Sequence, residues 1–332
     1  CTVLCGGETC ADMALFGKTK APFLKTFMTL ENGTPSHDTF SRVFRLLAPD
    51  QFRTCFIAFM QGFAKGCEGV VAIDGKTLRR SLDTAQSASP LHMVTAFAVD
   101  ARLVLGQLAV DTKSNEITAL PKLLDLLSLQ GTTVTADAMH CQRATAEKIC
   151  AHGADYVLAL KGNQGTLADD VTRFFKAPET SVTTHTTTDA DHGRIEVREA
   201  SVSTDIAWLQ EHHNWPGLQA IGRIIATREA AGKTTTSTRY YVMSAPLAPE
   251  RLGEIVRSHW AIENALHWVL DVVMNEDQMR NRRDHGPENL AILRHLALNL
   301  ARLEPSKGSM RGKLKRAGWD DNYLIKLVTG FR

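Results

Sequence analysis

Two short apolar runs in this chain each lead directly into an aspartate. The run at 70–73 is followed by Asp74, and the run at 132–136 by Asp137. Runs of this length and composition predict buried strands, and neighbouring parallel strands end at the same edge of a sheet. Open α/β sheets place their active sites at that edge. We therefore expect a sheet that brings the two carboxylates side by side.

One strand-ending aspartate is often only a cap of the next turn. Here both are followed by polar clusters, Gly75-Lys76-Thr77 after the first and residues 138–142 after the second. This repetition favours a site. Gly75-Lys76-Thr77 is expected to form a turn that leaves the carboxylate of Asp74 exposed.

Gly75-Lys76-Thr77 also suggests a loop that binds nucleotide phosphates. Such a loop needs another glycine five positions before the first one. That position holds Val70, and the equivalent positions of the other two Gly-Lys-Thr triplets hold Asp12 and Thr227. All three triplets lack the required glycine, which argues against nucleotide hydrolysis.

The pattern of apolar residues divides the chain into four parts. Residues 1–68 have helical spacing, with helices expected at 22–30 and 39–47. Residues 69–170 and 246–304 form an α/β core, with strands at 70–73, 91–99, 103–110, 132–136 and 156–160 and helices at 116–129 and 144–152. Residues 171–245 read as a β-rich insertion, and residues 305–332 as a basic, glycine-punctuated tail. The fold class is therefore a mixed α/β sheet flanked by helices.

Composition sets few limits on function. The 332 residues carry a formal net charge of +2, so a nucleic-acid signal must come from local patches. Seven cysteines without a Cys-x-x-Cys pair indicate neither disulfides nor zinc and fit a reduced cytosolic setting. No apolar run reaches the roughly 20 residues of a membrane span. The chain begins at Cys1 inside a helical pattern, so further sequence is expected upstream.

A third acidic group lies on the predicted helix around residue 263. Ile262, Leu266, Val269 and Val273 form an apolar stripe, and Glu263, His267 and Asp271 run beside it at intervals of four. Such a ladder could be an exposed surface pattern. Trp260 and Trp268 flank the glutamate, however, which argues against a simple solvent face.

Three carboxylates suit Mg²⁺ or Mn²⁺, which prefer oxygen ligands. Two such ions activate an attacking oxygen and stabilise a leaving one in phosphodiester displacement. The predicted metal ligands are Asp74, Asp137 and Glu263.

These residues stand in motifs that resemble a known family. The motifs are Ala72-Ile73-Asp74-Gly75-Lys76-Thr77, Thr135-Ala136-Asp137-Ala138-Met139-His140-Cys141-Gln142, and His259-Trp260-Ala261-Ile262-Glu263-Asn264 with Leu266-His267-Trp268. They resemble the insertion-sequence DDE transposases of the H-repeat-associated branch, whose catalytic fold is RNase H-like. Further blocks match in order, at 35–44, 160–164, 192–196 and 215–218, so the likeness covers nearly the whole chain.

The resemblance implies that Asp74, Asp137 and Glu263 are the catalytic, metal-binding triad, with two ions expected. It also implies cleavage at transposon ends followed by attack of the freed 3′-hydroxyl on target DNA. The expected partner is double-stranded DNA, both terminal repeats and target, bound by a homodimer. Related transposases carry a Tyr-Arg-Glu-Lys signature around the glutamate. Aligned on Glu263, its other positions fall on Val256, His259 and Leu270. Arg257 and His267 are candidates for the missing Arg and Lys.

Basic residues near the predicted site are candidates for DNA contact, although such clusters are often only solvated surface. The candidates are Lys76, Arg79, Arg80, Lys161, Gln164, Arg257, His259, His267, Arg280, Arg282 and Arg283. The tail adds Arg311, Lys313, Lys315 and Arg316. Trp208 or Trp215 would suit base stacking, with a core role favoured for both.

Two rival functions remain open at this stage. One is a metal-dependent nuclease on the same fold that lacks strand transfer. The other is a non-catalytic descendant that only binds DNA, against which the intact acidic triad argues.

Overall fold

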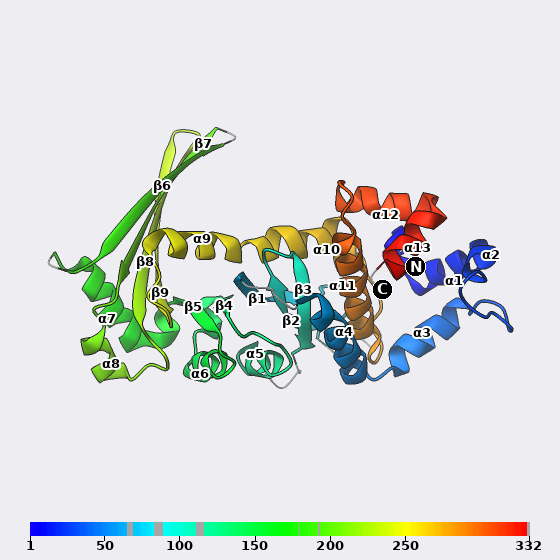
Figure 1. Ribbon diagram of the computed structural model, residues 1–332, viewed down its shortest axis with the longest axis horizontal. Coiled ribbons are helices and arrows are strands. Elements are labelled where there is room, and N and C mark those ends of the chain that lie inside the picture. Colours follow the sequence, from blue (N-terminus) through cyan, green and yellow to red (C-terminus); the bar gives the residue numbers. More distant parts are fainter. Residues whose placement is uncertain (65–68, 83–88, 111–115, 179, 192, 331–332) are drawn as a thin grey trace.

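A nine-stranded sheet runs through the molecule (Figure 1). The computed structural model describes residues 1–64, 69–82, 89–110, 116–178, 180–191 and 193–330, and its strands follow the order β3-β2-β1-β4-β5-β9-β8-β7-β6. The first five strands form the core of the sheet. They are β1 (Gly69–Thr77), β2 (His92–Ala98), β3 (Leu103–Ala109), β4 (Thr132–Ala136) and β5 (Asp155–Leu160).

Strand direction gives this core its fold class. β1, β2 and β3 pair antiparallel, whereas β4 and β5 run parallel to β1. Three antiparallel strands followed by two parallel ones, in the order 3-2-1-4-5, is the RNase H-like arrangement. The predicted α/β class and its RNase H-like sheet are confirmed.

Helices cover both faces of the core (Figure 1). α5 (Glu116–Leu124) and α6 (Arg143–Ala151) lie on one face. α9 (Pro249–His259) crosses the other face and continues through a π-helical turn, Ile262–His267, into α10 (Trp268–Val272). Single π-helical turns within α-helices are frequent at functional sites.

The β-rich segment extends the core sheet. It contains β6 (Thr183–Asp191), β7 (Arg194–Ser203), β8 (Ala220–Ala230) and β9 (Lys233–Met243), and β9 pairs antiparallel with β5. α7 (Gly165–Lys176) and α8 (Ala207–His213) cover one face of this extension. The two long hairpins project beyond the helices in Figure 1. The strand-rich character of 171–245 is confirmed, while its status as a separate domain stays a proposal because α7 spans residue 171.

The chain ends pack together at the far end of the core from the extension (Figure 1). This end contains α1 (Cys10–Thr19), α2 (Ala21–Leu24), α3 (His37–Leu46), α4 (Pro49–Ala64), α11 (Gly286–Leu303), α12 (Met310–Trp319) and α13 (Asp321–Thr329). Short 3₁₀ turns occur at Val3–Cys5, Ala138–His140, Gly162–Gln164 and Glu276–Gln278. Across the described helices, none combines the length and apolarity that a membrane span would need.

One expectation for the chain ends was wrong, because the helix predicted at 22–30 stops at Leu24. The basic segment expected at 305–332 contains two helices, α12 and α13. α12 and α13 bury Leu314, Tyr323 and Leu327. The segment therefore has an apolar side, which its many lysines and arginines made hard to recognise in the sequence. The helix predicted at 39–47 is confirmed, and the Ser36 hydroxyl caps it by accepting a hydrogen bond from the Thr39 N–H.

The turn predicted at Gly75-Lys76-Thr77 was also wrong. β1 continues through these residues because its pairing with β2 extends to Thr77 opposite His92. Gly75 is needed for space rather than for a turn, since a Cβ there would lie 2.6 Å from the carboxylate of Glu116. Asp74 is therefore held within a strand, with its side chain only 16% exposed.

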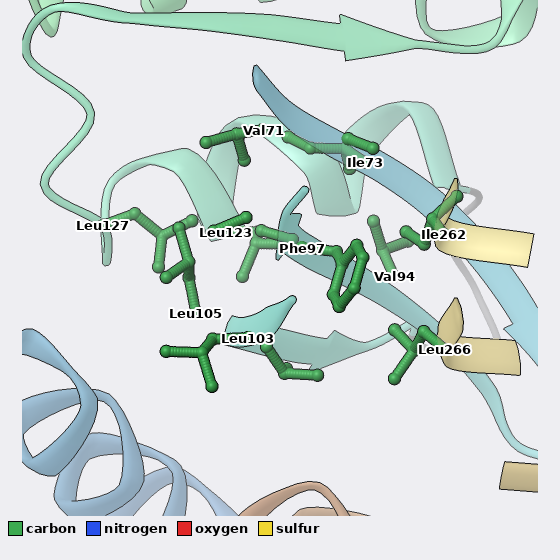
Figure 2. Packing of buried hydrophobic residues seen from close by; sticks show 14 of the residues in the cluster. Val71, Ile73, Val94, Phe97, Leu103, Leu105, Leu123, Leu127, Ile262 and Leu266 are labelled. Atoms are coloured by element: carbon green, nitrogen blue, oxygen red, sulfur yellow. The ribbon is translucent and has the colours of Figure 1, made fainter. Parts of the chain in front are cut away.

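The core between the sheet and the crossing helix fixes the position of the π-helical turn. Ile262 and Leu266 are fully buried and lie with Val94 and Phe97 in Figure 2. The predicted apolar stripe holds for these two residues. Beyond them the wide turn shifts the buried face to Leu270 and Met274, while Val269 and Val273 are only partly buried.

Asn299 of α11 secures the edge strand β3. Its buried side-chain amide donates to the Val104 carbonyl oxygen at 2.8 Å and accepts from the Val104 N–H at 3.0 Å. Asn299→Ala leaves both buried backbone groups unpaired, so we expect a loss of about 2–4 kcal/mol in the free energy of unfolding. Urea denaturation measures it. Asn322→Ala, at an exposed position, is the control and is expected to cost less than about 0.5 kcal/mol. Equal effects of the two changes would contradict this role.

Candidate active site

The two strand aspartates occupy matching positions on neighbouring parallel strands. The β1–β4 pairing ends at Ile73 opposite Ala136, and the next residue on each strand is Asp74 or Asp137. Both carboxylates therefore emerge at the same edge of the pairing, as the sequence predicted. Asp74 stays within β1, whereas Asp137 leads into a 3₁₀ turn and its side chain is 68% exposed.

The π-helical turn brings a third acid and a histidine to Asp74. Nδ1 of His267 lies 3.6 Å from Oδ2 of Asp74 and 3.5 Å from Oε2 of Glu263. One ligand atom from each of these three residues falls within 4.8 Å of the other two. His267 is buried, while Glu263 is half exposed. The sequence predicted that Asp74 and Glu263 bind the same metal site, whereas it made His267 a candidate for DNA contact.

Negative charge is crowded around Asp74. Burial raises the pKa of its carboxyl to about 8, and a hydrogen bond and repulsion from Glu263, with repulsion from Asp137, add to the effect. The Gly75 N–H opposes this shift. Burial also lowers the pKa of His267, so its imidazole is neutral and retains a lone pair. A bound cation would reduce the electrostatic repulsion between the carboxylates of this site.

Asp137 is oriented by a histidine from the crossing helix. Nε2 of His259 lies 3.7 Å from Oδ1 of Asp137, and its Nδ1 lies 3.0 Å from the hydroxyl of Thr135. The hydrogen bond and charge of His259 lower the pKa of Asp137, despite partial burial. His259 thus contacts Asp137, a predicted catalytic residue, whereas the sequence suggested a contact with DNA.

The loop that carries Asp137 is braced from the end of β5. The side-chain amide of Asn163 donates to the Ala138 carbonyl oxygen at 2.7 Å, and that of Gln164 to the Cys141 carbonyl oxygen at 2.9 Å. The amide nitrogen of Gln164 is therefore engaged within the protein, in place of the predicted DNA contact. Lys161, the neighbouring candidate, is exposed and acts electrostatically on Asp137.

Lys76 points into the protein, contrary to its predicted DNA contact. Its Nζ lies 2.7 Å from Asp271, 2.8 Å from Glu276 and 3.6 Å from Asp277. Burial alone would lower the pKa of Lys76, but the charges of Glu276 and Asp271 outweigh burial and raise it. Glu276 is itself buried and also faces Arg294 at 3.7 Å. This network ties β1 to α10 and to the segment that follows it.

The arginine candidates other than Arg257, which contacts Asp189 at 2.8 Å, form one exposed cluster. Nε of Arg282 donates to the carbonyl oxygen of Arg80 at 3.2 Å, which joins the two parts of the chain. Arg79 is 82% exposed and lies 3.6 Å from Asp277. Arg280 and Arg283 are also exposed. We call Arg79, Arg80, Arg280, Arg282 and Arg283 the arginine cluster.

Other candidates serve packing. Trp215 is buried and Trp208 stacks on Phe174, which is the core role that the sequence favoured. In the tail, Arg311 donates to the Val272 carbonyl oxygen and Lys313 to the Ala301 carbonyl oxygen.

A second cluster, which sequence reasoning missed, lies behind β1. The Glu116 carboxylate bonds Nε2 of His92 and, at 3.1 Å, Nε2 of the buried His140. These bonds lower the pKa of Glu116 to about 2. Glu116 also abuts Gly75 on the side of the strand opposite Asp74. Its only sequence signal was an acid at the start of a predicted helix, which is commonplace.

Comparison with known proteins connects this geometry to a family. Residues 65–300 match a family model described as "Transposase DDE domain", and residues 1–60 match one described as "DDE_Tnp_1-associated". His192, the first residue of the block at 192–196 that resembles the family, lies outside the described residues.

Full-length relatives are similar over almost the whole chain. "Putative protein YbfL" of Escherichia coli K12 is 38% identical over 99% of this chain and 89% of its own length. "H repeat-associated putative transposase YhhI" of the same strain is 38% identical over 99% of this chain and 90% of its own. A solved piggyBac transposase synaptic complex with hairpin DNA aligns with 97% of this chain and 70% of its own. Its TM-score is 0.44 at 10% identity, a likeness too weak to bear on function.

The Glu116 cluster predicts a pH-dependent contribution to stability. An unfolded glutamate has a pKa of about 4.3, well above the value of about 2 for folded Glu116. The ionised carboxylate therefore stabilises the fold above about pH 4.3, and this contribution is lost as the pH falls towards 2. Glu116→Gln is expected to cost about 1–3 kcal/mol near pH 7 and progressively less below about pH 4.

Urea denaturation at several pH values measures this difference. Glu211→Gln, at an exposed position on α8, is the matched control and is expected to have little effect at any pH. A Glu116→Gln deficit that is constant from neutral to acidic pH would show that the charge of Glu116 is not what stabilises the fold.

Proposed function

The chain belongs to the transposase DDE domain family, and on that basis we propose that it cuts DNA at transposon ends and joins the freed ends to target DNA. The reaction would depend on divalent metal ions held by Asp74, Asp137 and Glu263. The observation that carries this proposal is the matched register of Asp74 and Asp137 on β1 and β4, with Glu263 brought beside Asp74 by the crossing helix.

The donor set fits Mg²⁺ or Mn²⁺. Carboxylate oxygens predominate, and the pKa of Asp74, raised chiefly by burial and further by Glu263 and Asp137, is one that a bound divalent ion would lower. Asp74 interacts electrostatically with both Glu263 and Asp137, so the three carboxylates would hold the ions together. Bound ions of this kind polarise an attacking oxygen and stabilise the leaving one.

His267 joins the proposed ligand set. Its buried ring faces Asp74 and Glu263, and neutral imidazole is a suitable ligand for Mn²⁺. The role differs from the DNA contact that the sequence suggested. His259 would position Asp137, which it keeps ionised through the contact described above.

Phosphate contacts are proposed for the exposed basic groups around this site. The arginine cluster lies where β1 and the segment after α10 meet, and Lys161 lies beside Asp137. Such groups would hold the DNA backbone in register for cleavage. Lys76 and Gln164 are left out because protein groups occupy them. Binding as a dimer stays a prediction.

Single changes of the triad test the catalytic proposal. Asp74→Ala, Asp137→Ala and Glu263→Gln are each expected to reduce cleavage of a labelled terminal-repeat duplex by at least about 10³-fold. In the absence of metal, Asp74→Ala and Glu263→Gln should leave the melting temperature unchanged or raised, because carboxylate repulsion is removed. Asp137→Ala should lower it slightly, because the stabilising contact with His259 is lost. Asp169→Ala, an exposed acid on α7, is the control. Wild-type cleavage by all three variants would remove the catalytic assignment.

The same assay separates transposase from nuclease. Incubation of the protein with Mg²⁺, the labelled duplex and a target plasmid should yield DNA joined to the target. Cleaved ends without any joined product would favour the nuclease alternative.

The proposed role of His267 predicts a metal preference. A nitrogen ligand favours Mn²⁺ over Mg²⁺, so Mn²⁺ should raise the melting temperature of the wild-type protein at lower concentration. His267→Gln is expected to weaken Mn²⁺ binding by about tenfold or more and to affect Mg²⁺ less. Titration by Mn²⁺ electron paramagnetic resonance gives the affinity without DNA. An unchanged Mn²⁺ affinity in the variant would exclude His267 from the ligand set.

A further inference from the structure

A groove lined by arginines runs between α9 and one face of the sheet extension. It consists of two adjoining cavities of about 530 Å³ each, which share Arg198, Ile224, Gly253 and Arg257. α9 approaches β7 closely at Gly253, where a Cβ would lie 3.9 Å from that of Ala200. The lining residues come from the hairpins of the extension and from α9, which lie side by side in Figure 1.

Strand register places the basic side chains on this one face. Glu196 pairs with Arg228, Arg198 with Ala226, and Ile224 with Arg239, and directly paired residues point to the same side of a sheet. The arginines of the groove are Arg194, Arg198, Arg228, Arg239 and Arg257. Ala226 and Ser237 between them are small, which leaves the floor of the groove open.

Positive charge is in excess at the end of the groove nearest the active site. Arg198 contacts Asp189 and Glu196, and Arg257 contacts Asp189 at 2.8 Å. Arg228 and Arg239 are exposed, and no carboxylate of the described residues lies within ion-pair distance of either. At this end five guanidinium groups face the carboxylates of Glu196 and Asp189, whereas Glu250 and Glu254 line the other cavity. Like charges gathered in a concave surface favour an anionic ligand.

The groove leads to the catalytic candidates along α9. Trp260 closes its basic end, with the guanidinium of Arg239 at 5.3 Å from the indole ring. Glu263 follows one helical turn later, and both residues are exposed. Residues three apart on a helix are neighbours on its surface. An extended anion in the groove would therefore continue directly to Glu263.

We propose that this groove binds the sugar–phosphate backbone of the DNA strand that enters the active site, with Arg228 and Arg239 as its principal phosphate contacts. Guanidinium groups match phosphate geometry bidentately, and several at one surface suit a repeating polyanion. The identification of the ligand as DNA rests on the proposed function. The groove lies apart from the arginine cluster and extends the DNA path over the β-rich segment.

The test measures binding alone. Anisotropy of a fluorescein-labelled duplex of arbitrary sequence is titrated with full-length protein in EDTA, at salt concentrations from about 50 to 200 mM. Arg228→Ala with Arg239→Ala is expected to weaken binding about tenfold or more and to lower the slope of log affinity against log salt by about 1–2. Arg228→Lys with Arg239→Lys should retain most of the slope, because the charge is kept.

Arg173→Ala, on α7 over the opposite face of the extension, is the control and should bind like wild type. Wild-type affinity and slope in the double alanine variant would overturn the proposal. So would a loss of binding to poly-glutamate with no loss of DNA binding, which would assign the groove to an acidic polypeptide. Because EDTA removes catalysis, a wild-type protein that never cleaves DNA would refute the proposed function and leave this result standing.

Discussion

The parallel pairing of β1 with β4 is the constraint on which the site depends. Because that pairing stops at Ile73 and Ala136, the two following aspartates leave the sheet together. The third acid is fixed by the core, since Ile262 and Leu266 on either side of Glu263 are fully buried. Backbone hydrogen bonds thus position two carboxylates, and hydrophobic packing positions the third. Neither would hold the site without the other.

Charge compensation around the site explains why its acids can be tolerated. Asp74 is buried among carboxylates, yet His267 lies against both Asp74 and Glu263, and His259 lies against Asp137. Behind this layer, Lys76 and Arg294 offset Glu276, which is buried and would otherwise be costly to ionise. Lys76, which the sequence made a candidate for DNA contact, therefore forms ion pairs within the protein.

The sequence predicted the features that depend on local pattern. Apolar runs gave the core strands, alternation gave those of the extension, and the spacing from Ile262 to Leu266 gave the buried face of the crossing helix. The predictions failed where the environment of a residue depends on segments far away in the sequence. Gly75 was predicted to form a turn, but it lies in a strand packed against Glu116. Lys76 was predicted to contact DNA, but it forms ion pairs with Asp271 and Glu276.

The arginine groove illustrates the same limit. Its residues are scattered over three strands and a helix, and each alone is an ordinary surface arginine in a segment of alternating polarity. Only the register of β7, β8 and β9 shows that they share a face. A net charge of +2 hides this arrangement, because it sums the arginines of the groove with acids spread over the rest of the chain. In the proposed function, the gathering of arginines on one face of the extension, rather than overall basicity, is what would let a nearly neutral protein bind a polyanion next to a cluster of carboxylates.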